Sequence, residues 1–271
     1  MEQRERVLIV SVQTTQTDED FAYANQELAQ LVDTAMGEVV ATVTQRRESI
    51  SGRTLVGKGK VEEISHLVDE LEVDLVVFYQ SLTGSMVKNL NESINCRIID
   101  RVQLILDIFA MRARSKEGKL QVQLAQLNYL LPRLSGQREG LSRQGGGIGT
   151  RGPGETRLET DRRYIRKQIQ DIEEQLEQIK KHRERSREKR KSSNGFQLGL
   201  IGYTNAGKST ILNQLTQAGT YQMDQLFATL DPLTRQVDLF PNFEVTLTDT
   251  VGFIQELPTT LIHAFESTLE E

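Results

Sequence analysis

A short glycine-bearing segment, residues 202–210, constrains the fold of this chain more than any other stretch. It reads GYTNAGKST, which fits the pattern of a glycine, four residues and then Gly-Lys-Ser. This pattern is informative only between a strand and a helix. Residues 196–201 form a short apolar run of strand length, and residues 208–218 place their apolar side chains on one helical face. The segment therefore predicts a P-loop.

The residue types of this loop point to phosphate binding. Gly202 and Gly207 allow the backbone to curl, so that successive N–H groups face one concavity at the helix N-terminus. Lys208 would place its ammonium on the phosphate oxygens, and the Ser209 hydroxyl would ligate Mg²⁺. The alternative is an ordinary Gly-rich turn. This alternative is disfavoured because the segment matches the whole P-loop pattern and lies between a predicted strand and a predicted helix. We interpret the loop as a nucleotide-binding site.

Composition bounds the class of protein. The chain has 271 residues, of which 37% are apolar and 26% charged, enough for two domains with charged helical surfaces. Its net charge of −5 argues against a globally basic nucleic-acid binder, although the charge is unevenly spread. The single cysteine, Cys96, excludes an internal disulfide and is expected to be a buried, inert thiol. No run has the length of a signal peptide or a membrane span, so we expect a cytoplasmic protein. We also expect it to be a monomer.

Residues 1–102 alternate between strand-like and helix-like patterns. Strands are predicted at 7–12 and 74–79, with weaker candidates at 39–43 and 96–99, and helices at 18–36, 60–71 and 85–92. This alternation predicts a small parallel sheet flanked by helices. The turn at 54–60 (TLVGKGK) resembles a second phosphate loop but lacks its spacing, and a Gly-Lys-Gly entry into a helix is the favoured interpretation.

Two runs of heptad-like spacing follow, in residues 103–134 and 158–179. The first contains Leu106, Phe109, Ala113, Leu120, Leu124, Leu127, Leu131 and Leu134, and the second contains Leu158, Ile165, Ile169, Ile172, Leu176 and Ile179. We predict an antiparallel helical hairpin over residues 103–193, in preference to two unrelated amphipathic helices.

The segment between the two runs, residues 135–156, contains eight glycines and three arginines. Glycines permit close backbone approach, and Arg138, Arg143 and Arg151 suit phosphate, so the hairpin tip is a candidate contact for structured RNA. Plain disorder is an equally good interpretation of the composition. Residues 180–191 hold eight Lys or Arg against two Glu, either as a solvated helix end or as an RNA-binding strip.

A second nucleotide motif follows the P-loop by about forty residues. A predicted strand at 243–248, paired with one at 235–240, ends in Asp249-Thr250-Val251-Gly252. Asp249 would hold Mg²⁺ through water, and the Gly252 N–H would meet the γ-phosphate. A threonine between the two motifs should close over the metal when the γ-phosphate is present, and Thr229 and Thr234 are the candidates.

Taken together, the chain resembles the HflX-type GTPases of the translation-factor-related class over nearly its whole length. The most specific segments are GGGIGTRGPGETRLETDRR (145–163), LVGKGKVEEI (55–64), LILDIFAMRA (104–113), GYTNAGKST, FATLDPLTR and DTVGF. The resemblance implies Mg²⁺ and GTP, with Ser209, Thr229 and Asp249 at the metal and Lys208, Thr229 and Gly252 in catalysis. The residues that would line GTP are Gly202, Tyr203, Thr204, Asn205, Ala206, Gly207, Lys208, Ser209, Thr210, Phe227, Ala228, Thr229, Leu230, Asp231, Asp249, Thr250, Val251 and Gly252.

The resemblance also implies an α/β fold in three parts: an N-terminal parallel-sheet domain (1–102), the antiparallel helical hairpin (103–193) and a partial P-loop Ras-like G domain (196–271). Phe253 stands where Ras-like enzymes carry a glutamine that orients water, so slow intrinsic hydrolysis is expected. No Asn-Lys-x-Asp segment follows Gly252, so guanine specificity rests on the resemblance. We expect the sequence to be part of a longer protein.

Two functions remain open at this stage. The first is a Mg²⁺-dependent GTPase whose nucleotide state gates binding to the large ribosomal subunit and its RNA. The resemblance also implies a role in splitting stalled ribosomes. The second is a non-catalytic RNA- or ribosome-binding module in which the hairpin does the binding and the G domain is inert. An ATPase is a weaker third option, because no residue before Glu271 is seen to recognise the base.

Overall fold

The computed structural model describes residues 4–50, 52–134, 157–191, 196–216, 225–227, 230, 233–240 and 243–256. The chain divides into two compact units, each assembled from separated stretches: Met1–Ile105 with Leu127–Lys167, and Leu106–Gln126 with Gln168–Glu271. The predicted Gly-rich tip (135–156) lies outside the described residues, as do residues 192–195, 241–242 and 257–271.

A four-stranded sheet organises the first unit. Its strands are β1 (Glu5–Gln13), β2 (Gly37–Arg46), β3 (Leu75–Phe78) and β4 (Arg97–Asp100). Their order is β2-β1-β3-β4, and every neighbouring pair is parallel. The predicted parallel sheet is therefore confirmed, with strand ends that differ from the predicted ones by a few residues.

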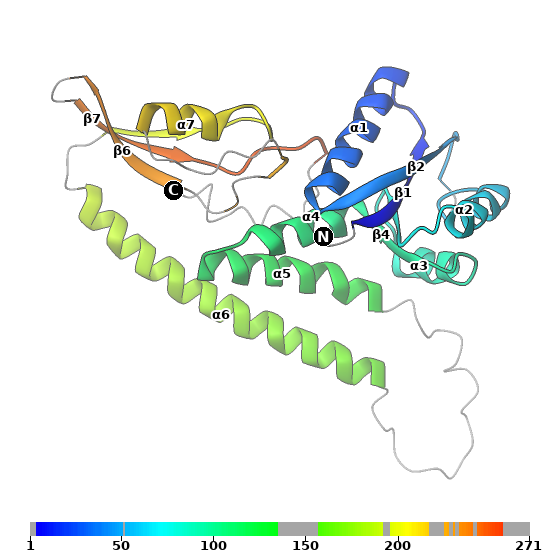
Figure 1. The fold of residues 1–271 in the computed structure, drawn as a ribbon. Coiled ribbons are helices and arrows are strands. Elements are labelled where there is room, and N and C mark those ends of the chain that lie inside the picture. The colour runs from blue at the N-terminus through cyan, green and yellow to red at the C-terminus, as the bar shows by residue number, and fades with distance from the viewer. Residues whose placement is uncertain are drawn as a thin grey trace, which may run out of the picture. The chain divides into compact units, whose positions relative to one another are not determined.

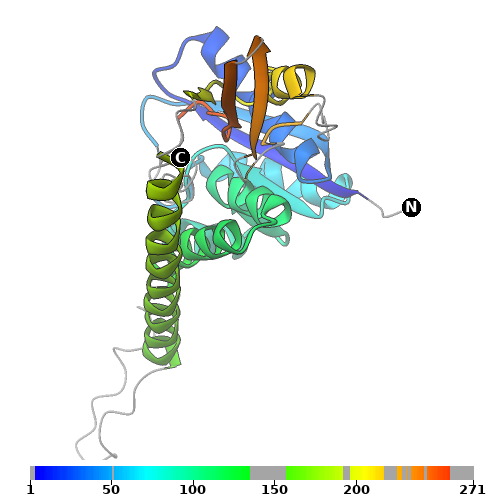
Figure 2. The ribbon, with the colours of Figure 1, turned by 90° about the vertical axis from the view of Figure 1, so that its left-hand side faces the viewer.

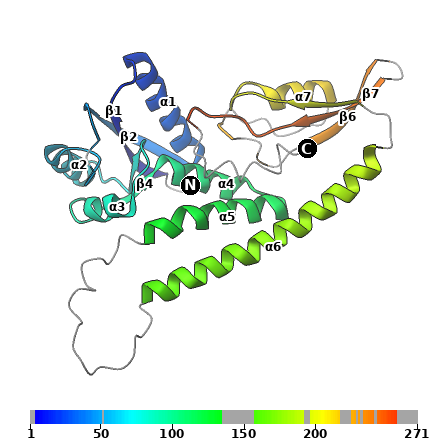
Figure 3. The ribbon, with the colours of Figure 1, turned by 180° about the vertical axis from the view of Figure 1, so that it is seen from behind.

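Helices cover both faces of this sheet (Figure 1). Helix α1 (Asp18–Thr34) lies on one face, and α2 (Lys58–Glu70) and α3 (Gly84–Asn91) lie on the other, as the view from behind also shows (Figure 3). The connection from β1 to β2 crosses the sheet in one direction, and the connections from β2 to β3 and from β3 to β4 cross it in the other. Right-handed crossovers therefore place α1 on one face and α2 and α3 on the opposite face.

Alternation along β1 explains why both faces are apolar. Leu8 and Val10 belong to a core cluster that contains Ile64 of α2 and Leu90 of α3. Ile9 lies between them in sequence, is fully buried, and by the two-residue period of a strand points to the opposite face. A strand buried on both sides is an almost continuous apolar run, and this is the pattern VLIVSV shows.

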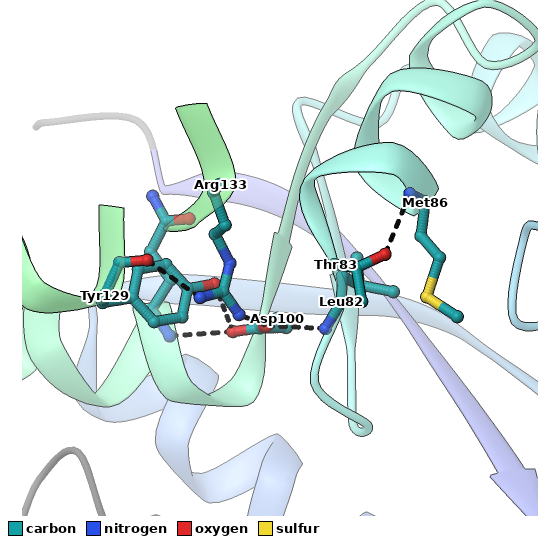
Figure 4. A network of polar contacts seen from close by, with 7 residues as sticks. Leu82, Thr83, Met86, Asp100, Tyr129 and Arg133 are labelled. Carbon is teal, nitrogen blue, oxygen red and sulfur yellow. Dashed lines mark hydrogen bonds and ion pairs between the residues drawn. The ribbon is translucent and has the colours of Figure 1, made fainter. Parts of the chain in front are cut away.

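Asp100, at the end of β4, is a polar hub of this unit (Figure 4). Its fully buried carboxylate accepts hydrogen bonds from the Leu82 N–H at 2.8 Å, the Tyr129 hydroxyl at 2.7 Å and the Arg133 guanidinium at 3.1 Å. The Arg133 carbonyl in turn lies so near Gly84 that an added Cβ would be 2.4 Å from it. These contacts pack residues 129–133 against the end of β4 and the start of α3.

The predicted long helix over residues 103–134 is wrong in one respect, because the structure breaks it. Helix α4 (Arg101–Arg112) ends, and α5 (Lys116–Arg133) begins after a short non-helical connection. The Ser115 hydroxyl accepts the Gly118 N–H at 2.9 Å, which is the geometry of a helix N-cap. Ser115 therefore starts a new helix where the apolar spacing alone suggested continuity.

The buried stripe of α5 also differs from the predicted leucine stripe. The fully buried apolar residues of this helix are Val122, Ala125 and Tyr129, at helical spacing. The predicted leucines 120, 124, 127 and 131 are only half-buried. The helix is therefore buried on a different face from the leucine stripe, and apolar spacing could not tell the two faces apart.

Helix α6 (Arg157–Lys191) is a single helix of 35 residues, and Figure 2 shows it from the side. Ile165 and Ile172 are buried at heptad spacing, as predicted. Arg183 forms an ion pair with Glu117 of α5 at 3.3 Å. This contact joins the late part of α6 to the start of α5, as an antiparallel pair would, and the limits of the hairpin stay a prediction. The basic run lies at the end of this same helix.

A three-stranded sheet organises the C-terminal part of the second unit. Strand β5 (Phe196–Leu200) is parallel to β7 (Phe243–Asp249), which is antiparallel to β6 (Leu233–Phe240). Helix α7 (Lys208–Thr216) packs on it through the fully buried Leu212, in a cluster with Val237, Val245 and Leu247. The expected strand, P-loop and helix are therefore present in the expected order.

Candidate functional site: a P-loop beside a DxxG strand end

The P-loop is curled by two left-handed residues. Gly207 has a φ of 82° and Asn205 a φ of 58°. Asparagine is one of the few non-glycine residues that adopt this region readily. Sequence reasoning assigned this freedom to Gly202 and Gly207, and Asn205 was missed in that role. Gly202 has an ordinary φ, and an added Cβ would approach only the flexible Lys208 side chain, at 3.8 Å.

Lys208 lies over the loop. Its Nζ donates to the carbonyl oxygens of Tyr203 at 2.7 Å and Gly202 at 3.1 Å. Burial lowers the pKa of Lys208, because the charged form loses hydration, and the carboxylate of Asp249 opposes the shift. The ammonium is thus held at the mouth of the loop, where phosphate oxygens could replace the two carbonyls.

Ser209 and Asp249 meet at the end of two parallel strands. The register pairs Leu200 of β5 with Asp249 of β7, so the carboxylate is placed beside the loop that leaves β5. The Ser209 hydroxyl donates to Asp249 at 2.6 Å. A hydroxyl and a carboxylate are hard oxygen ligands of the kind that Mg²⁺ prefers, so the residues present fit this metal. Among the described residues no cluster of three or more His, Cys, Asp or Glu offers another metal site.

The DxxG segment packs directly on the P-loop. An added Cβ at Gly252 would lie 2.6 Å from Cα and 2.7 Å from N of Thr204, so only glycine fits. The Phe253 N–H donates to Gly202 O at 3.0 Å, and the Thr204 N–H donates to Phe253 O at 2.8 Å. The structure therefore brings together the two motifs that the sequence placed about forty residues apart.

Three threonines near the site differ in their contacts. Thr250 is buried and its hydroxyl donates to Leu200 O at 2.6 Å, which ties the DxxG segment to β5. Thr234 lies in β6, where its hydroxyl pairs with that of Thr248 across the strands at 3.0 Å. A threonine engaged in a strand pair is a poor candidate for closing over a metal. Thr229, the other candidate, lies outside the described residues, as do Ala228 and Asp231.

Phe227 lies in the segment between the P-loop and the DxxG motif. It is 1% exposed, has a φ of 53°, and packs edge-to-face against Phe109 of α4 with ring centroids 4.8 Å apart. Gln225 accepts a hydrogen bond from Arg112 of the same helix. No periodicity or motif predicted either contact, although Phe109 and Arg112 lie in the segment LILDIFAMRA and Phe227 begins FATLDPLTR.

The turn TLVGKGK, which resembles a phosphate loop in sequence, is an ordinary helix entry in the structure. Gly57 is the N-cap of α2, and Lys58 and Lys60 pair with Glu62 and Glu63 at 3.9 and 2.7 Å, in agreement with an ordinary helix entry at TLVGKGK.

The thiol of Cys96 is partly buried and donates to Val73 O at 3.3 Å. Desolvation raises its pKa, so the thiol stays protonated at neutral pH. The raised pKa agrees with the expected low reactivity, whereas the side chain is only partly buried and not fully buried as expected.

The fold and the site define a P-loop nucleotide-binding protein, and the family models that match it are those of GTPases. Three family models match consecutive parts of the chain: "GTP-binding GTPase N-terminal" at residues 22–110, "GTP-binding GTPase Middle Region" at 112–190 and "50S ribosome-binding GTPase" at 197–271. Among the helices that the structure describes, none has the length and apolar character needed to cross a membrane.

Curated relatives narrow this class to one family. The GTPase HflX of Alkalihalophilus pseudofirmus is 60% identical over 267 residues, which is 98% of this chain and 63% of the relative. The GTPase HflX of Escherichia coli K12 is 46% identical over 98% of this chain and 62% of the relative. The chain belongs to the HflX family. It spans somewhat less than two thirds of the length of these relatives.

Solved structures agree with this fold. A crystal structure of SsGBP in complex with GDP is 25% identical, with a TM-score of 0.58, and the match covers 97% of this chain and 68% of that protein. A second, of a GTP-binding protein from Sulfolobus solfataricus in complex with GDP, has a TM-score of 0.53 at 23% identity, and covers 97% of this chain and 66% of that protein.

Proposed function

We propose that this chain binds and hydrolyses GTP with Mg²⁺, and that its nucleotide state controls binding to the large ribosomal subunit in the cytoplasm. The observation that carries the nucleotide part is the junction of Lys208, the Ser209–Asp249 pair and Gly252 at the end of two parallel strands. The ribosomal part is supported by the description of the family model over residues 197–271, "50S ribosome-binding GTPase".

Each residue of the junction has a distinct task in this proposal. The P-loop N–H groups and Lys208 bind the β- and γ-phosphates, and Gly252 offers its N–H to the γ-phosphate. Ser209, Asp249 and Thr229 would hold Mg²⁺, which when bound neutralises charge on the phosphate oxygens. The remaining predicted residues of segments 202–210, 228–231 and 249–252 line the nucleotide in this proposal. The ring of Phe227, which was also predicted to line it, is buried against Phe109.

Hydrolysis is expected to be slow in isolation. The backbone of Phe253 is hydrogen-bonded to the P-loop, and its phenyl ring has no group that could orient an attacking water. Another group must orient that water, and a ribosomal partner is the natural source. Addition of large ribosomal subunits should therefore raise the turnover number.

The test is turnover of GTP by the chain with and without large ribosomal subunits, with ATP as the competing substrate. We expect slow GTP hydrolysis that ribosomal subunits stimulate and that Lys208→Ala abolishes, whereas Lys58→Ala, at an exposed lysine, leaves it intact. Equal use of ATP would contradict GTP as the substrate. Unchanged GTP affinity in Lys208→Ala would contradict the assigned site.

A non-catalytic ribosome- or RNA-binding module is the second candidate, favoured by the eight Lys or Arg residues at 180–191 at the end of α6. Salt-sensitive binding to ribosomal subunits without any GTP turnover would support this candidate over the first.

A further inference from the structure

The DxxG segment carries one residue more than the strand end and loop that lie beside it. Leu200 pairs with Asp249 at the end of the β5–β7 ladder. Tyr203 pairs with Phe253 in an isolated parallel bridge, three residues further along one side and four residues further along the other. An extra residue between two fixed pairs makes a bulge, which changes the direction of the side chains next to it. The directions of Asp249 and Gly252 therefore depend on how this bulge is held.

Thr250 holds the bulge through its side chain. It is 8% exposed, and its hydroxyl donates to Leu200 O at 2.6 Å. Leu200 is therefore the partner of two successive residues, Asp249 in the ladder and Thr250 through this hydroxyl. The hydrogen bonds between Phe253 and the P-loop use only backbone atoms, which most residues could supply. Although Thr250 was predicted to line the nucleotide, its hydroxyl is bonded to β5.

Thr250 lies between the two residues of the DxxG motif that are assigned to Mg²⁺ and the γ-phosphate. Asp249 precedes it directly, and Gly252 follows it by two residues. Asp249 is 1% exposed and accepts the Ser209 hydroxyl. Gly252 packs on the backbone of Thr204 so closely that no side chain fits there. Both residues occupy tight positions, and a displacement of about 1 Å in a positioned group can cost roughly a hundredfold in rate.

We propose that Thr250 is a positioning residue for the nucleotide site, because its hydroxyl sets the directions of Asp249 and Gly252. The contribution of Mg²⁺ to nucleotide binding then depends on this hydroxyl, whereas binding without the metal depends on the P-loop. This inference rests on the proposed function, since it requires that Asp249 and Gly252 meet a Mg²⁺-nucleotide. It adds that a hydroxyl bonded to β5 determines how strongly the site responds to the metal.

The test measures the affinity of a non-hydrolysable GTP analogue with Mg²⁺ and in EDTA, for the unaltered chain and for Thr250→Val. The ratio of the two affinities is the gain that Mg²⁺ provides. Valine keeps the shape of threonine and lacks only the hydroxyl, so we expect this gain to fall about fivefold while the affinity in EDTA is unchanged. Thr248→Val is the matched control and should keep the full gain. Thr248 lies on the same strand, but its hydroxyl pairs with that of Thr234 on β6, the neighbour of β7 on the side opposite β5.

Two further variants separate positioning from a general loss of structure. Thr250→Ser keeps the hydroxyl and should retain the gain from Mg²⁺, and Thr250→Ala, which removes the hydroxyl without the bulk of valine, should lose it. An unchanged gain in Thr250→Val, the same reduced gain in Thr250→Ser, or an equal loss of affinity with Mg²⁺ and in EDTA would overturn the inference alone. If the unaltered chain binds the analogue without any gain from Mg²⁺, the proposed function itself fails, and the inference fails with it.

Discussion

The Ser209 hydroxyl donates a 2.6 Å hydrogen bond to the carboxylate of Asp249, and so joins the start of α7 to the end of β7. The contact exists because β5 and β7 are parallel neighbours, which brings both strand ends to one edge of the sheet. Carboxyl ends of parallel strands are where ligands bind in α/β proteins.

Removal of the Ser209 hydroxyl should weaken the contribution of Mg²⁺ to binding. We expect Ser209→Ala to lower nucleotide affinity about tenfold in the presence of Mg²⁺, the loss of one ligand interaction of roughly 1.5 kcal/mol. In EDTA the affinity should be unchanged. Isothermal titration under both conditions measures the difference. Ser209→Thr keeps the hydroxyl and should behave as the unaltered chain, and full Mg²⁺ stimulation of Ser209→Ala would contradict the assignment.

Nucleotide affinity should fall at alkaline pH, and at a lower pH than an ordinary lysine would give. Burial lowers the pKa of Lys208 in the free protein, whereas bound phosphate oxygens favour the charged form and raise it. Affinity is therefore constant below the free-protein pKa and declines as the pH rises through it. Titration across the alkaline range measures the decline. Lys208→Ala, if its residual binding is measurable, should lack it, and an identical decline there would assign the effect to another group.

A methyl group at position 252 should separate the DxxG segment from the P-loop. Gly252→Ala would place a Cβ within 2.6–2.8 Å of three Thr204 atoms, two of them backbone. We expect GTP turnover to fall at least tenfold, since the Gly252 N–H would leave its place beside the loop. Gly199→Ala is the matched control, because a Cβ there meets no atom within 4 Å. Equal turnover of the two variants would show that the close approach has no functional role.

Loss of the Asp100 carboxylate should destabilise the first unit. Asp100→Ala leaves the Tyr129 hydroxyl and the Arg133 guanidinium without this acceptor, and we expect a loss of about 3 kcal/mol in the free energy of unfolding. Asp33→Ala removes an exposed ion pair with Arg4 and should cost less than about 1 kcal/mol. Urea unfolding of both variants measures the contrast, and similar losses would show that the hub is not a stabilising centre.

Local sequence determined the elements and the chemistry of the site. The run VLIVSV is apolar at every position but one, which specifies a strand buried on both faces, and GYTNAGKST specifies a strand–loop–helix junction for phosphate. These features could be predicted because each depends on residues that are close together in the chain. The helix break was also local, since it needs only the Ser115 cap, but the apolar spacing across it concealed the signal.

Tertiary structure decided what depends on contacts between distant residues. The left-handed Asn205, the tight fit of Gly252 on Thr204 and the choice of Val122, Ala125 and Tyr129 as the buried face of α5 are set by neighbours from other segments. The packing of Phe227 on Phe109 is of the same kind. No periodicity or motif predicts such contacts, because an apolar side chain or a glycine can pack against many different partners. The partner is determined only by how the whole chain folds.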